Sequence, residues 1–539
     1  MAFLKREYGG IQPSIPVAML RIRIPFVHFK ISPPEIVTGL MNACTSYGAL
    51  AVLTGTLGLA PEIAWSLVVF ETLMYSCNWL LGEPSICGWI TPAMALVIVY
   101  LEGYVDPGLA GALTAASEYL SAESGEAVTL GLSNVDKLVA AGTAAGQQAW
   151  IDAAHNTTTL RMQAMACTEL ELGILFIVLG VTGLSKQLNT LVPPGVKAGI
   201  VLGAGVGAVR ARMLEGGAMD TATWGCLGGL IIVFLLMFSL RVRNKMEGNR
   251  ALQILGNYSF LWAVLAMFII GGIAGEFDFS GILDEGLFKA PDIPGMMMVT
   301  SPFMIGWGSP DMWIAGIPMA LISWVIAYGD FITVQQLGYQ AQRDDEYIEF
   351  DPNRTNVICG FRNVVIALVA GYPAQAGPLS APYCVATYQR YKQSGRQGMD
   401  SIYDGSGTNI IFTAIGLFVY PLYMAAAAAA GPMLVVVLTI QGYVCTQICF
   451  DLAFDKVDEG VAGMLAGFIL ARGGGVGLIA GIALYLLLAD TEKIKSDYAG
   501  NKERQRIEDE EMARQNAALQ ARMEAFKRGE IAADEGGTE

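Results

Sequence analysis

A succession of apolar runs between residues 35 and 489, separated by short polar connections, most constrains the fold. An α-helix needs about 20 apolar residues to cross a bilayer. Only 15% of the residues are charged, against about 25% in soluble proteins. The pattern therefore predicts an all-α polytopic membrane protein. We expect 14 transmembrane segments in two sets of seven, near 35–58, 62–81, 88–102, 164–184, 193–211, 222–240 and 253–275, and near 312–335, 356–370, 381–391, 408–429, 431–450, 456–471 and 474–489.

Basic residues indicate the orientation, because they concentrate in cytoplasmic connections. With a cytoplasmic N-terminus, most of them lie inside and the long acidic connection 103–163 lies outside. An odd number of spans per set inverts the second set relative to the first. We expect a cytoplasmic N-terminal segment (1–31), a first seven-span repeat (32–275), an extracytoplasmic connection (276–311), a second repeat (312–490) and a charged, solvated helical tail in the cytoplasm (491–539). We expect the location to be a bacterial inner (plasma) membrane, with both termini cytoplasmic.

Several classes of function are disfavoured by composition. The net charge of −15 argues against nucleic acid as a partner. The nine cysteines show no C-x-x-C spacing, and the two histidines, His28 and His155, lie outside the apolar runs. These features weaken a metal site, and no nucleophile–base pair or ATP-binding loop is recognisable, so we expect no enzyme.

Two stretches interrupt the apolar pattern at corresponding places. GEPSICGWITPA (82–93) and GYPAQAGPLSAP (371–382) match at two glycines and one proline, the last prolines, Pro92 and Pro382, are one place apart, and each stretch occupies the third position of its set. Two coincidental loops are the alternative, but short, Gly/Pro-interrupted segments at equal rank in two halves are typical of binding sites in inverted-repeat transporters. Non-helical backbone at this depth is tolerated only where it is buried in protein or lines a cavity. Each stretch precedes a half-helix whose first N–H groups favour an anion or acceptor-rich solute.

Candidate substrate-binding residues supply hydroxyl, amide and backbone donors around these helix starts or on the eighth span. They are Ser85, Gly88, Thr91, Gln335, Gln375, Gly377, Ser380 and Tyr383. Tyr383 is a candidate stacking or lid residue, although packing is the commoner role of a lone aromatic ring.

Two carboxylates are candidates for ion coupling. Asp330 lies within an apolar span, where an ionisable group is a functional candidate; the alternative is a water-facing residue at the cytoplasmic helix end. Glu83 lies in the first broken stretch. Its carboxylate either pairs with the neighbouring helix start, shares a cation with Asp330 or sits at the cytoplasmic rim. Glu71 and Asn78, seven residues apart, are either a structural hydrogen-bonded knot or part of a proton path.

Longer stretches suggest a family. Three stretches look like particular helices of one family of permeases. They are LVPPGVKAGIVLGAGVGAV (191–209), which looks like the fifth helix of that family, ISPPEIVTGLMNACTSYGAL (31–50), which looks like the first, and SWVIAYGDFITVQQLG (323–338), which looks like the eighth and carries its acidic residue, here Asp330. Together with 394–405 and 454–484, they resemble the nucleobase–cation symporters (uracil, xanthine and adenine/guanine permeases) and the related sulfate-permease anion transporters. In GYPAQAGPLSAPYCVATYQRY (371–391), the glutamate of the first group and the arginine of the second are both absent.

The resemblance implies a seven-plus-seven inverted repeat with half-helices at the third and tenth segments. A core domain holding both broken stretches would move against a gate domain holding the fifth and twelfth spans. It implies a homodimeric secondary active transporter, an H⁺ or Na⁺ symporter of a nucleobase-like heterocycle or small organic anion, without a cofactor other than the coupling ion. The alternative is a sulfate-permease-like anion transporter or exchanger, or an uncoupled anion channel.

Overall fold

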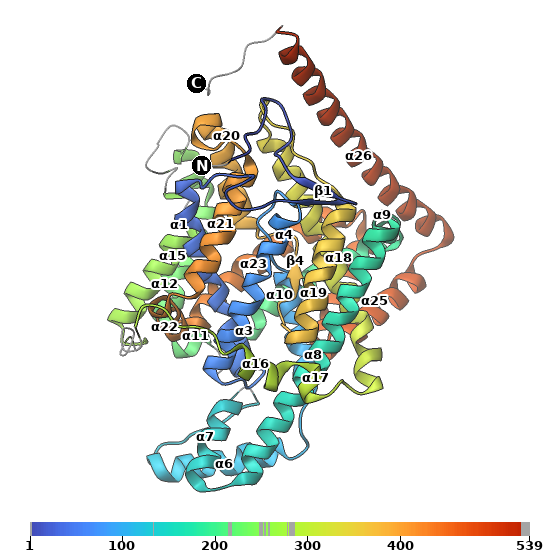
Figure 1. Cartoon of the computed structure of the whole chain (residues 1–539). Coiled ribbons are helices and arrows are strands. Elements are labelled where there is room, and N and C mark those ends of the chain that lie inside the picture. Colours follow the sequence, from blue (N-terminus) through green and yellow to red (C-terminus); the bar gives the residue numbers. More distant parts are fainter. Residues whose placement is uncertain are drawn as a thin grey trace.

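The chain folds into a helical bundle that carries two very small sheets (Figure 1). The computed structural model describes residues 3–132, 134–213, 218–246, 252, 255–256, 259–277, 279 and 286–529. The start of the expected span 253–275, part of the connection 276–311 and the tail after residue 529 lie outside these residues.

One group of helices surrounds the two broken stretches. In this group α8 packs against α18 and α19, and α1 packs against α21. The group consists of α1 (Pro33–Ser46), η1 (Tyr47–Ala49), α2 (Leu50–Gly55), α3 (Pro61–Leu73), α4 (Tyr75–Leu80), α5 (Thr91–Glu102), α8 (Gln148–Thr182), α18 (Pro310–Ala341), α19 (Pro352–Val369), α20 (Ala381–Gly398) and α21 (Ile402–Leu417).

A second group packs around α10 (Pro194–Met213) and α23 (Ala430–Leu452), the fifth and twelfth expected spans. Small residues bring these two helices together: a Cβ atom added at Gly442 would lie 2.9 Å from the carbonyl oxygen of Gly205. The group also contains α11 (Ala218–Thr221), α12 (Thr223–Met237), α13 (Leu240–Met246), α15 (Ser259–Ile273), α24 (Lys456–Arg472) and α25 (Gly474–Leu488). Helix α9 (Ser185–Leu191) contacts α18 of the first group, and α22 (Tyr420–Ala428) contacts η1, α1, α21 and α23.

Fewer helices are long enough to cross a membrane than the fourteen spans expected from the sequence. Within the described ranges, four helices are long and apolar enough to cross a membrane, or up to six if each sharply bent pair is one span. Others are shorter, such as α5, and the expected span 62–81 is divided at Met74 into α3 and α4. The chain is therefore an all-α membrane protein with several apolar spans, and the expected fourteen remain a prediction.

The connection 103–163 is a helical cap and not an extended loop. It contains α6 (Leu109–Ser124), α7 (Val135–Ala145) and the first turns of α8, which share a separate apolar core. We expected the fourth span at 164–184, but α8 begins at Gln148, because no proline or glycine interrupts residues 148–172. The cap lies at the end of the bundle opposite the N-terminus (Figure 1).

Both terminal segments are packed onto the bundle. The hairpin of β1 (Ile15–Val17) and β2 (Leu20–Ile22) continues into backbone hydrogen bonds from Arg21 and Arg23 to the end of α4. The tail is one helix, α26 (Thr491–Lys527), whose Asn501 donates to the carbonyl oxygens of Thr190 at 3.1 Å and Val192 at 3.0 Å. The first half of the expected solvated tail is therefore docked. The short helices α16 (Ile293–Thr300) and α17 (Pro302–Ile305) fall in the connection before α18.

Candidate functional site

The two broken stretches meet inside the first group of helices. They form an antiparallel strand pair, β3 (Gly88–Trp89) with β4 (Ala376–Gly377), in which Gly88 is opposite Gly377. The backbone contact continues on both sides, since Ile90 N–H donates to the Ala374 carbonyl at 3.0 Å and Ser380 N–H donates to the Ile86 carbonyl at 2.8 Å. Segments almost 300 residues apart thus form one structural unit, the crossed segments (82–93 and 371–382).

Glycine is required at the crossing because the two backbones are in contact there. A Cβ atom added at Gly88 would lie 2.9 Å from the Cβ of Ser380 and 3.0 Å from the Leu379 carbonyl oxygen. One added at Gly377 would lie 3.1 Å from the backbone nitrogen of Ile90. Any side chain at these positions pushes the strands apart.

A short helix follows each strand, and neither has a side-chain N-cap. Helix α5 begins at Thr91 and α20 at Ala381, with no capping hydrogen bond from Ile90 or Ser380. Thr91 and Ser380 are half-buried, whereas Ser85 and Gln375 are fully buried. The hydroxyls of Thr91 and Ser380 therefore remain the most accessible of the expected binding groups at the crossing.

The remaining expected binding residues at the crossing are held by packing. The Tyr383 hydroxyl lies 3.2 Å from the Thr45 hydroxyl on α1, and the residue is only 6% exposed. Gln375 has a φ of 50°, in the left-handed region, and neither of its side-chain amide atoms has a hydrogen-bond partner in the part of the chain that the structure describes. A buried, strained and unpartnered amide is a candidate for ligand or water contact.

Helix α19 clamps the second crossed segment. The side-chain amide of Asn363 makes the two hydrogen bonds that a neighbouring strand would make. Its Nδ2 donates to the Ala376 carbonyl at 2.9 Å, and its Oδ1 accepts from Ala376 N–H at 2.9 Å. The neighbouring Arg362 donates through Nη1 to the Gly377 carbonyl at 3.0 Å and to Asn78 Oδ1 at 3.2 Å. A buried cation therefore adjoins the crossing.

Two buried carboxylates, one on α3 and one on α8, accept hydrogen bonds from the crossed segments. Glu71 on α3 accepts from the Trp89 indole at 3.1 Å, and Glu169 on α8 accepts from Tyr372 N–H at 2.7 Å. The sequence analysis missed Arg362, Asn363 and Glu169. Arg362 and Glu169 carry the signal that drew attention to Asp330, an ionisable residue within an apolar run.

Asp330 lies on α18, which packs against both α5 and α20. The residue is half-buried, and its carboxylate has no hydrogen-bond or ion-pair partner among the described residues. Five residues separate Asp330 from Gln335, about 140° around the helix. The structure therefore does not bring these two candidates together.

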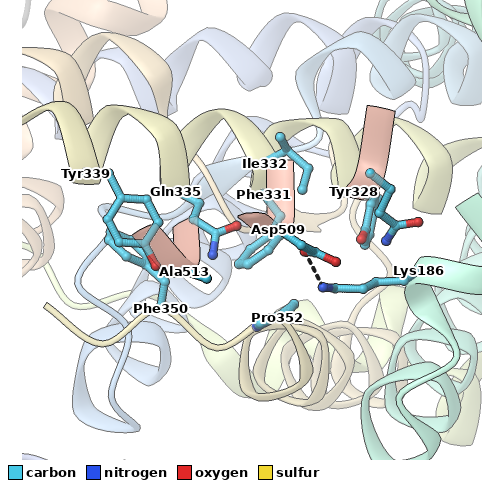
Figure 2. Close-up of a pocket in the computed structure, with 11 residues that line it drawn as sticks. Lys186, Tyr328, Phe331, Ile332, Gln335, Tyr339, Phe350, Pro352, Asp509 and Ala513 are labelled. Carbon is cyan, nitrogen blue, oxygen red and sulfur yellow. Dashed lines mark hydrogen bonds and ion pairs between the residues drawn. The ribbon is translucent and has the colours of Figure 1, made fainter. Parts of the chain in front are cut away.

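Gln335 lines a different cavity, of about 340 Å³, between α18 and the tail helix α26. Figure 2 shows Gln335 among aromatic rings from α18 and the following connection, with Lys186 and Asp509 at the other end. Those two side chains form an ion pair at 2.5 Å. Gln335 is thus placed away from the crossed segments.

Glu83 is held in a buried ion pair. Its Oε1 lies 2.7 Å from Arg354 Nε and its Oε2 accepts from the Thr355 hydroxyl at 2.6 Å. The side chains of Glu83 and Arg354 are each 1% exposed. This geometry favours a structural role that fixes the start of α19 to the first crossed segment.

Comparison with known proteins finds a similarity to a family of permeases. Residues 122–376 match the Permease family (Xan_ur_permease), a range that begins after the first crossed segment and ends within the second. No curated protein matches the chain.

Several solved structures are similar at low sequence identity. The transmembrane domain of the cyanobacterium bicarbonate transporter BicA has 14% identity and a TM-score of 0.44, over 84% of this chain and 99% of that chain. Murine Solute Carrier 26 family member A9, an anion transporter in the inward-facing state, has 12% identity and a TM-score of 0.45, over 86% and 69%. A further structure of SLC26A9 has 14% identity and a TM-score of 0.45, over 84% and 64%. Residues 122–376, just under half of the chain, are thus similar to the Permease family, which is a family of transport proteins and not of enzymes.

Proposed function

We propose that this permease is a secondary active transporter that moves a small polar metabolite by alternating access, driven by H⁺ or Na⁺. The observation that carries the proposal is the strand pair Gly88–Trp89 with Ala376–Gly377, from which α5 and α20 start without side-chain caps. Paired half-helix starts inside a membrane protein offer N–H groups and positive dipole ends to a solute. The proposed movement is of the α1–α5, α8 and α18–α21 group, the core, against the gate group built on α10 and α23.

The substrate class follows from the groups at the crossing. They are hydroxyls, amides and backbone donors, so a nucleobase-like heterocycle or small organic anion with several acceptor atoms is the proposed cargo. Thr91 and Ser380 are the proposed first contacts, with Gln375 and Tyr383 behind them. Asp330 is the proposed coupling carboxylate, because it is half-buried, has no partner among the described residues and lies on a helix that packs against both half-helices.

An anion transporter, an exchanger or an uncoupled anion channel is a second candidate. One observation favours it: Arg362 supplies a buried positive charge that bonds directly to the Gly377 carbonyl. For either candidate we propose a homodimer in a bacterial inner membrane, with both termini in the cytoplasm.

Ligand screening tests the cargo. The purified full chain is heated with uracil, xanthine, adenine, bicarbonate, sulfate or a small carboxylate, and the unfolding midpoint is recorded. A bound ligand at 100 times its Kd stabilises the folded state by about 2.7 kcal/mol. A shift with a nucleobase or the carboxylate supports the leading proposal, a shift with inorganic anions alone supports the second, and no shift with any probe contradicts the proposed substrate classes.

Uptake into proteoliposomes tests coupling. Transport of the ligand found by screening is measured with an imposed H⁺ gradient, an imposed Na⁺ gradient or neither. We expect one gradient to accelerate uptake and Asp330→Asn to abolish that acceleration. Asp311→Asn, an exposed residue in the first turn of the same helix, is the matched control. Equal uptake with and without both gradients would exclude symport, and normal coupling in Asp330→Asn would exclude the assigned role.

A further inference from the structure

A buried charge cluster lies beside the crossed segments and is separate from Asp330. Its three charged members are Glu71 on α3, Glu169 on α8 and Arg362 on α19, and all three side chains are fully buried. Each carboxylate binds a different crossed segment. Glu71 accepts a hydrogen bond from the indole of Trp89 in the first segment, and Glu169 accepts one from the backbone N–H of Tyr372 in the second. The rings of Trp89 and Tyr372 are themselves neighbours, with centroids 6.0 Å apart.

The cluster contains two carboxylates but only one guanidinium. Arg362 interacts electrostatically with both carboxylates, and the carboxylates interact with each other, but no ion pair joins Arg362 to either one among the described residues. Two ionised carboxylates and one guanidinium leave one excess negative charge. Since burying an uncompensated ion costs several kcal/mol, binding of one proton neutralises the cluster at the smallest cost.

The other titratable groups that face the cluster do not change this balance. They are Tyr75 from α4, Cys77 from α4, Cys87 and Tyr372 from the crossed segments, and Cys359 from α19. Phenols and thiols are ordinarily neutral near pH 7. The net charge therefore depends on the two carboxylates and Arg362.

Unpartnered polar atoms mark the same place. Glu71 Oε1, Glu169 Oε1 and two nitrogens of Arg362 are buried without a hydrogen-bond partner in the described part of the chain. The Asn78 amide nitrogen, the Tyr372 hydroxyl and the whole Gln375 amide share this property. Buried polar groups normally have hydrogen-bond partners. The unpartnered carboxylate oxygens of Glu71 and Glu169 are therefore available to bind a proton.

We propose that Glu71 and Glu169 share one proton beside Arg362, and that this proton is bound or released as the crossed segments move. The inference rests on the proposed transporter function. A protonated carboxyl is a weaker acceptor than a carboxylate, so protonation loosens the hold on Trp89 or Tyr372. By linkage, movement of either segment in turn changes the affinity for the proton.

Infrared spectroscopy of the purified full chain tests whether the proton is present. The carbonyl stretch of protonated carboxyls is recorded between about pH 5 and pH 8 for the wild type, Glu71→Gln and Glu169→Gln. Each single substitution removes the excess negative charge, so the remaining carboxylate is balanced by Arg362. We expect either substitution alone to abolish the same band. The exposed Glu118→Gln, in the cap, is the control and retains it. If neither substitution removes a protonated-carboxyl signal, the proposal is wrong.

Hydrogen exchange tests the link to the crossed segments without a substrate. After correction for intrinsic rates, amide exchange in 82–93 and 371–382 should increase as the pH falls in the wild type, and each glutamine variant should lose that dependence. The same pH response in wild type and variants would refute the coupling. Both glutamine substitutions keep an acceptor oxygen, and the wild-type measurement stands alone if a variant fails to fold.

The two proposals fail in distinguishable ways. If no uptake of any screened solute occurs but the infrared and exchange results are as expected, the transporter proposal fails and the proton site stands. If uptake is driven by a gradient but the carboxyl band is insensitive to both substitutions, the proton site fails alone.

Discussion

Removal of Glu83 offers a quantitative test of how the first crossed segment is anchored. In Glu83→Ala, the buried Arg354 loses its closest carboxylate, at 2.7 Å, and Thr355 loses its acceptor. Breaking one partner of a buried ion pair typically costs 3–5 kcal/mol. Arg354 keeps the Glu349 carbonyl at 2.8 Å and the partly exposed Glu349 carboxylate at 3.5 Å, so we expect the low end, about 3 kcal/mol.

The assay is a thermal scan of the detergent-solubilised full chain at one fixed heating rate, because membrane proteins of this size often unfold irreversibly. With about 2 °C per kcal/mol for a large domain, the midpoint should fall by about 6 °C. Glu62→Ala is the control: its ion pair with Lys289, at 3.0 Å, leaves Glu62 71% exposed, and such pairs contribute about 0–1 kcal/mol.

A double-mutant cycle makes the reasoning refutable. Arg354→Ala alone should be similarly harmful, but the double variant should be less destabilised than the two single effects together, by about 0.5–3 kcal/mol. A midpoint for Glu83→Ala within about 1 °C of the wild type, or strict additivity in the double variant, would show that the pair does not anchor the segment. The ion-coupling role of Glu83 would then regain support.

Three further outcomes are expected from the same structure. Gly88→Ala should cost roughly 1–3 kcal/mol by overpacking at the crossing, whereas Gly111→Ala, which meets open space, should not; thermal midpoints decide. Asn363→Ala leaves a backbone donor and acceptor of β4 unpaired, so hydrogen exchange in 371–382 should rise; unchanged exchange would contradict the clamp. Burial opposes ionisation of Asp400, but the hydrogen bond from Lys30 and two nearby arginines lower its pKa overall. The stabilisation by ionised Asp400 is therefore present above the ordinary carboxyl pKa of about 3.9 and is lost as the pH falls through the lower folded-state pKa. Thermal midpoints measured between about pH 2 and pH 5 should show this dependence, and Asp400→Asn should remove it.

The crossing was predictable because its signal is local. Glycine and proline at matched spacing identify both stretches, and their strand pairing agrees with that prediction. The charges around the crossing are harder to assign. Arg362 is a single cation in an otherwise apolar run, and its significance depends on Glu71 and Glu169, which are distant in sequence.

Other features depend on geometry that a list of residue types does not contain. Gln335 is near Asp330 in sequence, but helical rotation directs it to the cavity beneath α26. Arg6 pairs with Asp345 at 2.8 Å across 339 positions, a contact that no local pattern indicates. The cap also escaped prediction, because a hydropathy reading sees only a polar connection where alanine-rich helices pack on one another.

The uninterrupted course of α8 has a practical consequence. Its 35 residues extend about 52 Å, well beyond the roughly 30 Å of a hydrocarbon core. The same rod carries Glu169 at one level and the packed helices α6 and α7 at another. A spectroscopic label or an antibody fragment fixed to the cap is therefore joined rigidly to the helices around the crossing, and its tilt or displacement would report their motion from outside the bilayer.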